Sequence, residues 1–113
     1  MILLVSGSRK ITNKKFVFEC LDEICAKYDV TKMIFGDANG VDKFARLFCI
    51  LNHIKYKKYQ AYWSRYGKKA GPIRNGWMVK DCDKGVAIWD GKSTGTADTI
   101  KKLTRARKLL KTI

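Results

Sequence analysis

The sequence has little proline and little histidine, and its cysteines are not arranged as metal ligands. Pro72 is the one proline and His53 the one histidine among 113 residues. So little proline is not typical of a flexible linker or a low-complexity segment. None of the four cysteines stands in a Cys-x-x-Cys pair, and His53 alone cannot complete a zinc set at the usual spacing. We therefore expect neither a metal site nor a cofactor.

Apolar segments of membrane-spanning length are also missing. The apolar start, Met1 to Val5, is followed at once by Gly7-Ser8-Arg9 and is far too short for a signal peptide or a membrane span. Cys20, Cys25 and Cys49 fall on helical apolar stripes, which indicates small buried side chains with reduced thiols. The sequence therefore predicts a cytoplasmic protein without a membrane partner.

Two common nucleotide-binding fingerprints are absent. No Gly-x-Gly-x-x-Gly follows the first predicted strand. Gly91-Lys92-Ser93 ends like a Walker A loop, but Val86 stands where that loop requires its first glycine. Gly85 is one residue too early and would begin a strand. This spacing excludes a P-loop nucleotide triphosphatase.

What the sequence does contain is enough apolar material for a core and a large positive charge. Hydrophobic residues make up 46% and aromatic residues 12%, which predicts one folded domain over residues 1–113. The net charge is +14, from 24 lysines and arginines against 10 acidic residues, and it favours anionic partners. Many lysines are scattered along the chain, which is more typical of solvated helix faces than of a groove. We expect only weak, non-specific binding to nucleic acid.

Apolar runs alternate with helical periodicity along the whole chain. Strands are predicted at 2–6, 32–35, 56–62 and 86–89. Helices are predicted from a cap at Thr12 or Asn13 to Tyr28, from Val41 to Asn52, from Ile73 to Asp81, and from Thr96 onward. The last segment, 109–113, either ends the final helix or adds an edge strand. This order predicts an α/β fold, a single Rossmann-like domain whose mostly parallel sheet has helices on both faces.

Glycine-rich turns follow three of the predicted strands. The carboxyl ends of parallel strands meet at one edge of the sheet, where α/β proteins bind their ligands. The turn between Asp90 and Thr96 leads from an apolar strand into a helix, an arrangement that offers backbone N–H groups and a partial positive charge to a phosphate. The competing interpretation is a helix-capping turn without a ligand.

Four motifs in order give the chain a family resemblance. They are Val5-Ser-Gly-Ser-Arg9, Gly36-Asp-Ala-Asn-Gly-Val-Asp42, Tyr66-Gly-Lys-Lys-Ala-Gly-Pro-Ile-Arg-Asn75 and Gly91-Lys-Ser-Thr-Gly-Thr96. Together they resemble the YspA-like branch of the SLOG superfamily, which also includes the Lonely Guy phosphoribohydrolases and the DNA-processing protein A domain. The resemblance spans nearly the full chain.

The resemblance implies a domain that binds a nucleotide or a nucleotide-derived small molecule, as a sensor, carrier or sequestering protein, and we expect a homo-oligomer. It implies a set of ligand-binding residues drawn from the turns and from one helix: Gly7, Ser8, Arg9, Gly36, Asn39, Gly40, Asp42, Arg74, Asn75, Asp90, Gly91, Ser93, Thr94, Gly95 and Thr96. Arginine can meet phosphate with forked donors, and Asp42 can accept hydrogen bonds from ribose hydroxyls. Trp63 or Tyr66 can stack on a base.

Several of these residues also have purely structural interpretations. Arg9 can be an exposed turn arginine, and Asp42 can serve only to complement the N-terminus of its helix. Trp63 and Tyr66 fit core or interface positions better than base stacking.

A nucleic-acid-binding protein, supported by the charge alone, is the second alternative function. The first alternative is a nucleotide-processing N-glycosidic hydrolase. In the Lonely Guy enzymes the loop reads Pro-Gly-Gly-x-Gly-Thr-x-x-Glu, whereas Thr99 stands here at the place of the glutamate. Asp98 is one residue short, a rotation of about 100° around a helix. We also expect nearby arginines to keep Asp42 and Asp90 ionised, which makes them poor general acids. The sequence therefore predicts binding without efficient turnover and no catalytic residue.

Overall fold

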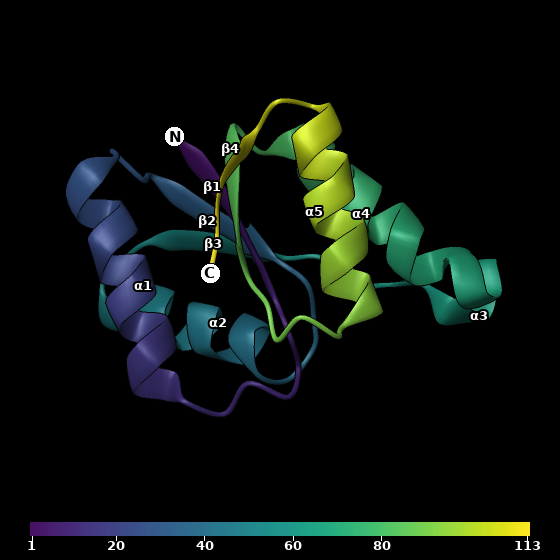
Figure 1. The fold of residues 1–113 in the computed structure, drawn as a ribbon, viewed down its shortest axis with the longest axis horizontal. Coiled ribbons are helices and arrows are strands. Elements are labelled where there is room, and N and C mark those ends of the chain that lie inside the picture. Colours follow the sequence, from purple (N-terminus) through teal and green to yellow (C-terminus); the bar gives the residue numbers. More distant parts are fainter.

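The chain folds into a parallel sheet with helices on both faces (Figure 1). The computed structural model describes all 113 residues. The elements are β1 (Ile2–Gly7), α1 (Lys14–Lys27), β2 (Lys32–Phe35), α2 (Val41–Leu51), β3 (Lys55–Lys58), α3 (Trp63–Tyr66), the 3-10 turn η1 (Gly67–Lys69), α4 (Ala70–Asp81), β4 (Lys84–Ile88), α5 (Thr94–Arg105) and β5 (Leu109–Thr112).

The five strands lie in the order β3-β2-β1-β4-β5, and every neighbouring pair is parallel. β2 and β3 are added in turn on one side of β1. The chain then crosses to the other side of β1, where it adds β4 and β5. The predicted α/β fold with a Rossmann-like sheet is confirmed. This order places a topological switch point between β1 and β4.

Alternate residues of the strands face two separate apolar layers. Leu3 and Val5 of β1 pack in one core with α1 and α2, while Leu4 packs with α4 and α5 in the other. Figure 1 shows α1 and α2 on one side of the sheet and α4 and α5 on the opposite side. None of the helices combines the length and the apolar composition that a membrane crossing requires. All four cysteines are free thiols.

The first helix begins with the usual kind of cap, whereas two helices end on a left-handed residue that is not the usual glycine. Asn13 caps α1 by accepting a hydrogen bond from the Phe16 N–H at 3.1 Å, as one of the two predicted caps. The ends of α2 and α5 use left-handed residues at His53 and Arg107, with φ of 55° and 58°. The N–H of Lys108 donates to the Leu103 carbonyl, which closes α5 in a Schellman motif. The segment after α5 therefore forms the edge strand β5.

Three predicted segments differ from the structure by more than two residues. The strand predicted over 56–62 ends at Lys58, because its one neighbour, β2, ends at Phe35. The helix predicted to begin beside Pro72 begins at Ala70. Proline is tolerated inside that first turn because the first four N–H groups of a helix lack intrahelical partners. The segment between the strand predicted over 56–62 and the helix predicted from Ile73 has no predicted element, and it contains the short helices α3 and η1.

Candidate functional site

The turns after β1, β2 and β4 meet at one edge of the sheet, at the switch point. Ser8 holds them together and is fully buried. Its N–H donates to the Ile88 carbonyl at 3.1 Å, and its hydroxyl accepts from the Asp90 N–H at 3.1 Å. Its carbonyl accepts from the Val41 N–H at 3.4 Å. Ser8 thus joins the three turns, and its hydroxyl oxygen already has a protein partner.

Glycines in these turns allow close packing. Gly40 has φ of 71°, and a Cβ there would lie 2.5 Å from the Ser8 carbonyl oxygen. The first turn therefore covers the N-terminus of α2, so Gly40 packs against protein backbone rather than opening to a ligand. Gly7 packs against a side chain instead, because a Cβ at this position would lie 2.5 Å from the side chain of Val41. Asn39 is exposed and lines a neighbouring hollow, outside the crevice between β1 and β4.

The turn after β4 is organised by its own side chains. The Asp90 carboxylate accepts hydrogen bonds from the N–H groups of Lys92 and Ser93, both at 2.8 Å. These bonds, first that of Ser93, lower the pKa of Asp90, so backbone N–H groups, and not the expected arginines, favour the ionised carboxylate. Gly91 provides the left-handed residue, with φ of 80°, and the Trp89 indole N–H donates to the Ser93 carbonyl at 3.0 Å. The carboxylate of Asp90 therefore shapes the turn.

The N-terminus of α5 opens to the crevice. The first N–H groups of any helix lack intrahelical partners, and the Ser93 side chain does not cap them. Beside them is an outer cavity of about 330 Å³ that no hydrophobic residue lines. Its lining consists of Ser8, Arg9, Lys10, Asp90, Lys92, Ser93, Thr94 and Gly95. The Arg9 guanidinium is exposed and forms no ion pair in the protein. This combination of free N–H groups and free cations is suited to an anion.

A smaller inner cavity of about 70 Å³ continues from the outer one beneath Arg9, Ser93 and Gly95. Residues of α2 and α4 meet at this cavity. Besides the three residues that it shares with the outer cavity, its lining consists of Ser6, Gly7, Gly36, Ala38, Asp42, Arg74, Asn75, Met78 and Thr96. Gly36 is essential to this arrangement, because a Cβ there would lie 2.6 Å from Arg74 Nη1 and 2.8 Å from Asp42 Oδ2.

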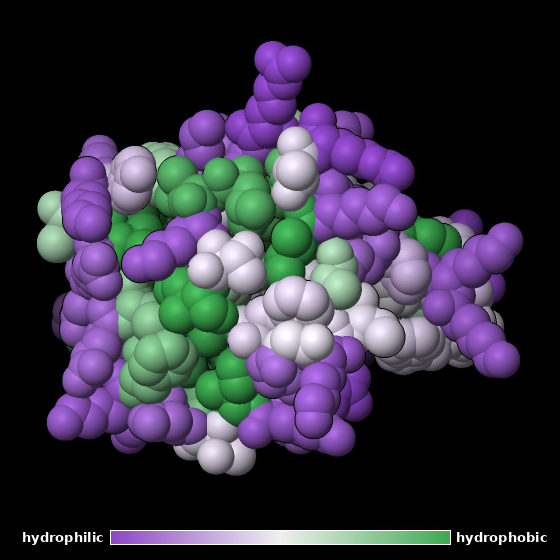
Figure 2. All heavy atoms as spheres, in the orientation of Figure 1, coloured by the Kyte–Doolittle hydropathy of each residue, from purple (hydrophilic) through white to green (hydrophobic).

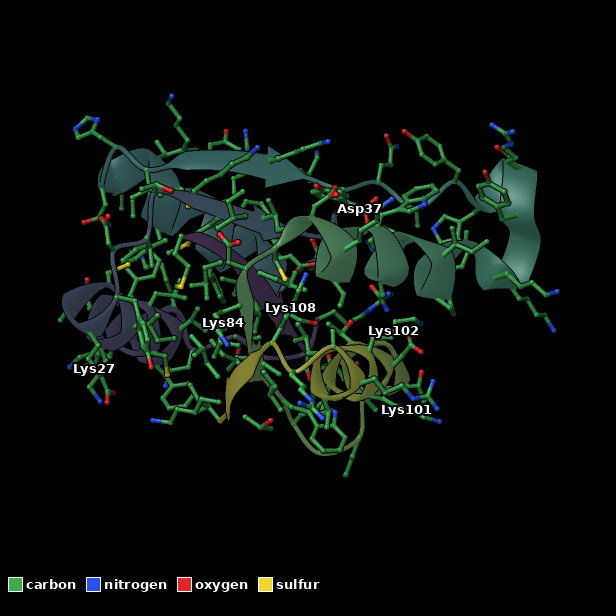
Figure 3. The ribbon with its side chains drawn as sticks, turned by 90° about the horizontal axis from the view of Figure 1, so that it is seen from above. Lys27, Asp37, Lys84, Lys101, Lys102 and Lys108 are labelled. Carbon is green, nitrogen blue, oxygen red and sulfur yellow. The ribbon has the colours of Figure 1, made fainter.

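Arg74 is held by contacts that the sequence did not predict. Its Nη1 forms an ion pair with Asp37 at 3.1 Å and donates to the Tyr59 carbonyl at 3.3 Å. Its Nε donates to Asn75 Oδ1 at 3.0 Å. Figure 3 places Asp37 beside α4. Arg74 lies in the second turn of α4, not the first as predicted, and its Nη2 has no partner in the protein. Nothing in the sequence connects Asp37 with a residue 37 positions away.

Asn75 connects α4 with the first turn of α5. Its Nδ2 donates to the Gly95 carbonyl at 3.3 Å and to Asp98 Oδ2 at 3.1 Å. Asp98 also pairs with Lys102, which lies between α4 and α5 in Figure 3. Asp98 lines neither cavity, in agreement with the predicted rotation away from the site.

The carboxyl of Asp42 is almost completely buried, with 7% of the residue exposed. It accepts a hydrogen bond from the Ala38 N–H at 3.2 Å. Burial raises the pKa of Asp42 to about 7, and the Ala38 bond and the charge of Arg74 only partly oppose this rise. Contrary to the expectation from their charge, nearby arginines therefore do not keep Asp42 fully ionised at neutral pH, because removal from water outweighs their attraction.

The two aromatic candidates lie away from the crevice. Trp63 is 56% exposed on α3, and Tyr66 packs edge-on against Trp77 with ring centroids 6.3 Å apart. Neither residue lines either cavity. The structure therefore does not bring them to the site as base-stacking groups.

A sequence model of the YspA, cpYpsA-related SLOG family matches residues 1–66. The chain belongs to this family. No curated protein matches the chain, and no solved structure does so either. The match to the SLOG family covers the turns after β1 and β2, while α4 and the turn after β4 lie beyond it. Membership of this SLOG family indicates binding or processing of a nucleotide-related ligand.

Proposed function

We propose that the domain binds a nucleotide-derived ligand and holds its phosphate groups at the N-terminus of α5. One observation carries the proposal: this helix end is uncapped by any side chain and opens to a cavity beside free cationic groups. A phosphate there would accept hydrogen bonds from backbone N–H groups of the first turn and gain from the helix dipole. Arg9, Lys10 and Lys92 would add positive charge.

The rest of the ligand would extend toward the inner cavity. Asp42 and Asn75 supply polar atoms there that can meet ribose or base groups, and Arg74 offers its free Nη2. Both cavities are dominated by polar groups, which fits a ligand rich in phosphate and hydroxyl groups. We infer a sensor, carrier or sequestering protein, because no acidic residue takes the place of the Lonely Guy glutamate.

A second candidate function, hydrolysis of the N-glycosidic bond, is favoured by Asp42. A carboxyl group with a pKa near 7 can exchange protons at neutral pH, as a general acid or base must. Chromatography of the free base released from nucleoside monophosphates and NAD-derived nucleotides separates the two functions. Multiple turnovers that Asp42→Asn abolishes would establish the enzyme, whereas binding without release of base supports the sensor or carrier.

Calorimetry with ADP tests the phosphate site. Arg9→Ala removes one exposed guanidinium and breaks no ion pair within the protein, so the fold should be unchanged. A charge-assisted hydrogen bond contributes about 1.5–3 kcal/mol, so affinity should fall about 10- to 150-fold. Lys14→Ala is the matched control, because it removes one exposed positive charge at the start of α1. Equal losses in both variants, or no loss in either, would contradict the proposed site.

A further inference from the structure

A second region of the molecule concentrates charge and aromatic rings. Residues 55–69 contain six lysines and arginines, five aromatic residues and no acidic residue. We call this segment the basic–aromatic strip. Its cations are Lys55, Lys57, Lys58, Arg65, Lys68 and Lys69, and its aromatic residues are Tyr56, Tyr59, Tyr62, Trp63 and Tyr66. None of these cations forms an ion pair with the 10 acidic residues of the chain.

The strip follows an open edge of the molecule. All four residues of β3 are exposed, and β3 pairs only with β2, so its outer backbone edge is free. The strip continues into α3 and η1, which project from the body beyond α4 (Figure 1). Hydrophilic side chains extend from this end of the molecule in Figure 2. The strip thus crosses one side of the domain and ends on a protruding arm.

Two hollows lie along the strip and share Lys58. The first, of about 240 Å³, brings Lys43 and Arg46 of α2 beside Lys58. The second, of about 320 Å³, lies between Lys57, Tyr62 and Trp77. The exposed acidic groups at their rims already have partners. Asp37 is paired with Arg74, and Asp81 accepts the hydroxyl of Tyr59 at 2.5 Å. The cations of the hollows form no ion pair within the protein, so they are available to an external anion.

Two aromatic side chains of the strip are unusually open to water. Tyr62 is 50% exposed and Trp63 is 56% exposed. Tyr62 touches Trp77 at a tilt, with centroids 6.0 Å apart, and Trp63 lies over the backbone of Gly71. Each side chain therefore has one contact with the protein and leaves about half of its surface exposed. Open rings among lysines match unpaired bases next to phosphates, because the bases stack on the rings. A duplex hides the faces of its bases and would leave these rings unused.

We propose that the basic–aromatic strip binds single-stranded nucleic acid, with phosphates along β3 and bases stacked on Tyr62 and Trp63. This surface lies apart from the α5 N-terminus and needs no nucleotide bound there. The interaction would be independent of base sequence, because aromatic stacking and contacts with phosphate do not read base edges.

Fluorescence anisotropy with a labelled oligothymidylate of about 16 nucleotides tests the proposal. Affinity should fall as salt rises from about 50 to 200 mM. Lys57→Ala/Lys58→Ala should reduce the slope of log K against log salt by about 1.4, since each single-strand phosphate contact contributes about 0.7. The matched control is Lys14→Ala/Lys15→Ala, an exposed pair on α1 that carries the same charge and should leave the slope unchanged.

The aromatic contribution is tested separately with Tyr62→Ala, and with Trp63→Ala as a second variant. Each should weaken binding about 5- to 150-fold, and circular dichroism should show an unchanged fold. A labelled duplex should bind more weakly than the single strand and should not respond to either aromatic variant. If the two lysine double variants reduced the salt slope equally, the proposal would be overturned, because binding would then depend on the total charge and not on the basic–aromatic strip. Binding to anionic phosphatidylserine vesicles without binding to the oligonucleotide would overturn it as well.

Discussion

Replacement of Asp42 by asparagine should change how the stability of the domain depends on pH. The ordinary pKa of this group is 3.8, and burial raises it to about 7 in the folded protein. Between about pH 4 and pH 7 the native state holds a proton that the unfolded chain has lost, so the free energy of unfolding falls as pH rises. Above about pH 7 both states are ionised, and the full cost of a buried carboxylate is present.

The magnitude follows from the two pKa values. At about 1.36 kcal/mol per pKa unit, the difference between 3.8 and about 7 corresponds to about 4 kcal/mol as an upper limit. Asp42→Asn cannot ionise, and its side-chain oxygen can still accept the Ala38 N–H. The variant should therefore match the wild type near pH 4 and be more stable near pH 8. Asp90, whose pKa is lowered, changes the free energy of unfolding only below about pH 4, and it does so equally in both proteins.

Urea denaturation at about pH 4, pH 6 and pH 8 measures this effect in the wild type and in Asp42→Asn. Asp22→Asn is the control, because Asp22 is exposed on α1 and forms no hydrogen bond with its side chain. If the free energies of unfolding of the wild type and Asp42→Asn differed by the same amount at all three pH values, the reasoning would be refuted. It would mean that the carboxyl of Asp42 titrates alike in the folded and unfolded chains.

Three further predictions concern the same site. Gly40→Ala should destabilise the domain by at least 1–3 kcal/mol, about the cost of a strained backbone, because its Cβ also collides with a carbonyl oxygen. Gly67→Ala, at φ of 59° with no atom within 4 Å, should cost only about 1 kcal/mol in the same urea experiment. The affinity for ADP-ribose should rise as pH rises through about 7 in the wild type, because ionised Asp42 is the stronger acceptor for ribose hydroxyls, and calorimetry of Asp42→Asn should show no such rise. Arg74→Ala should weaken ADP binding and also lower the urea midpoint, because it leaves Asp37 and the side-chain oxygen of Asn75 without their partner.

The sequence predicts the fold well because local patterns and global packing agree. Buried strands such as Met33 to Phe35 read as short apolar runs, and the Asn13 cap lies where the helical period begins. The sequence allows two alternatives for 109–113, the end of the last helix or the edge strand β5, since the left-handed residue that ends α5 is Arg107 rather than glycine. The usual signal for a helix end is absent there.

The sequence predicts which turns meet, but not what each residue does in them. Ser8 and Gly40 were predicted as ligand contacts, and the structure shows each in close contact with backbone of another turn. Such roles depend on distances between segments far apart in the chain. The burial of Asp42 is likewise a product of tertiary packing, and it raises the pKa of this carboxyl against the attraction of nearby Arg74.

The most direct test of the phosphate site is a titration of the ¹⁵N-labelled protein with ADP, followed by two-dimensional NMR. The site predicts that the largest amide shifts belong to Thr94, Gly95 and Thr96, because their N–H groups form the first turn of α5. The Arg9 side-chain signal should move with the same dissociation constant. Shifts confined to β3 and α3, or no saturable shift at the start of α5, would contradict the account.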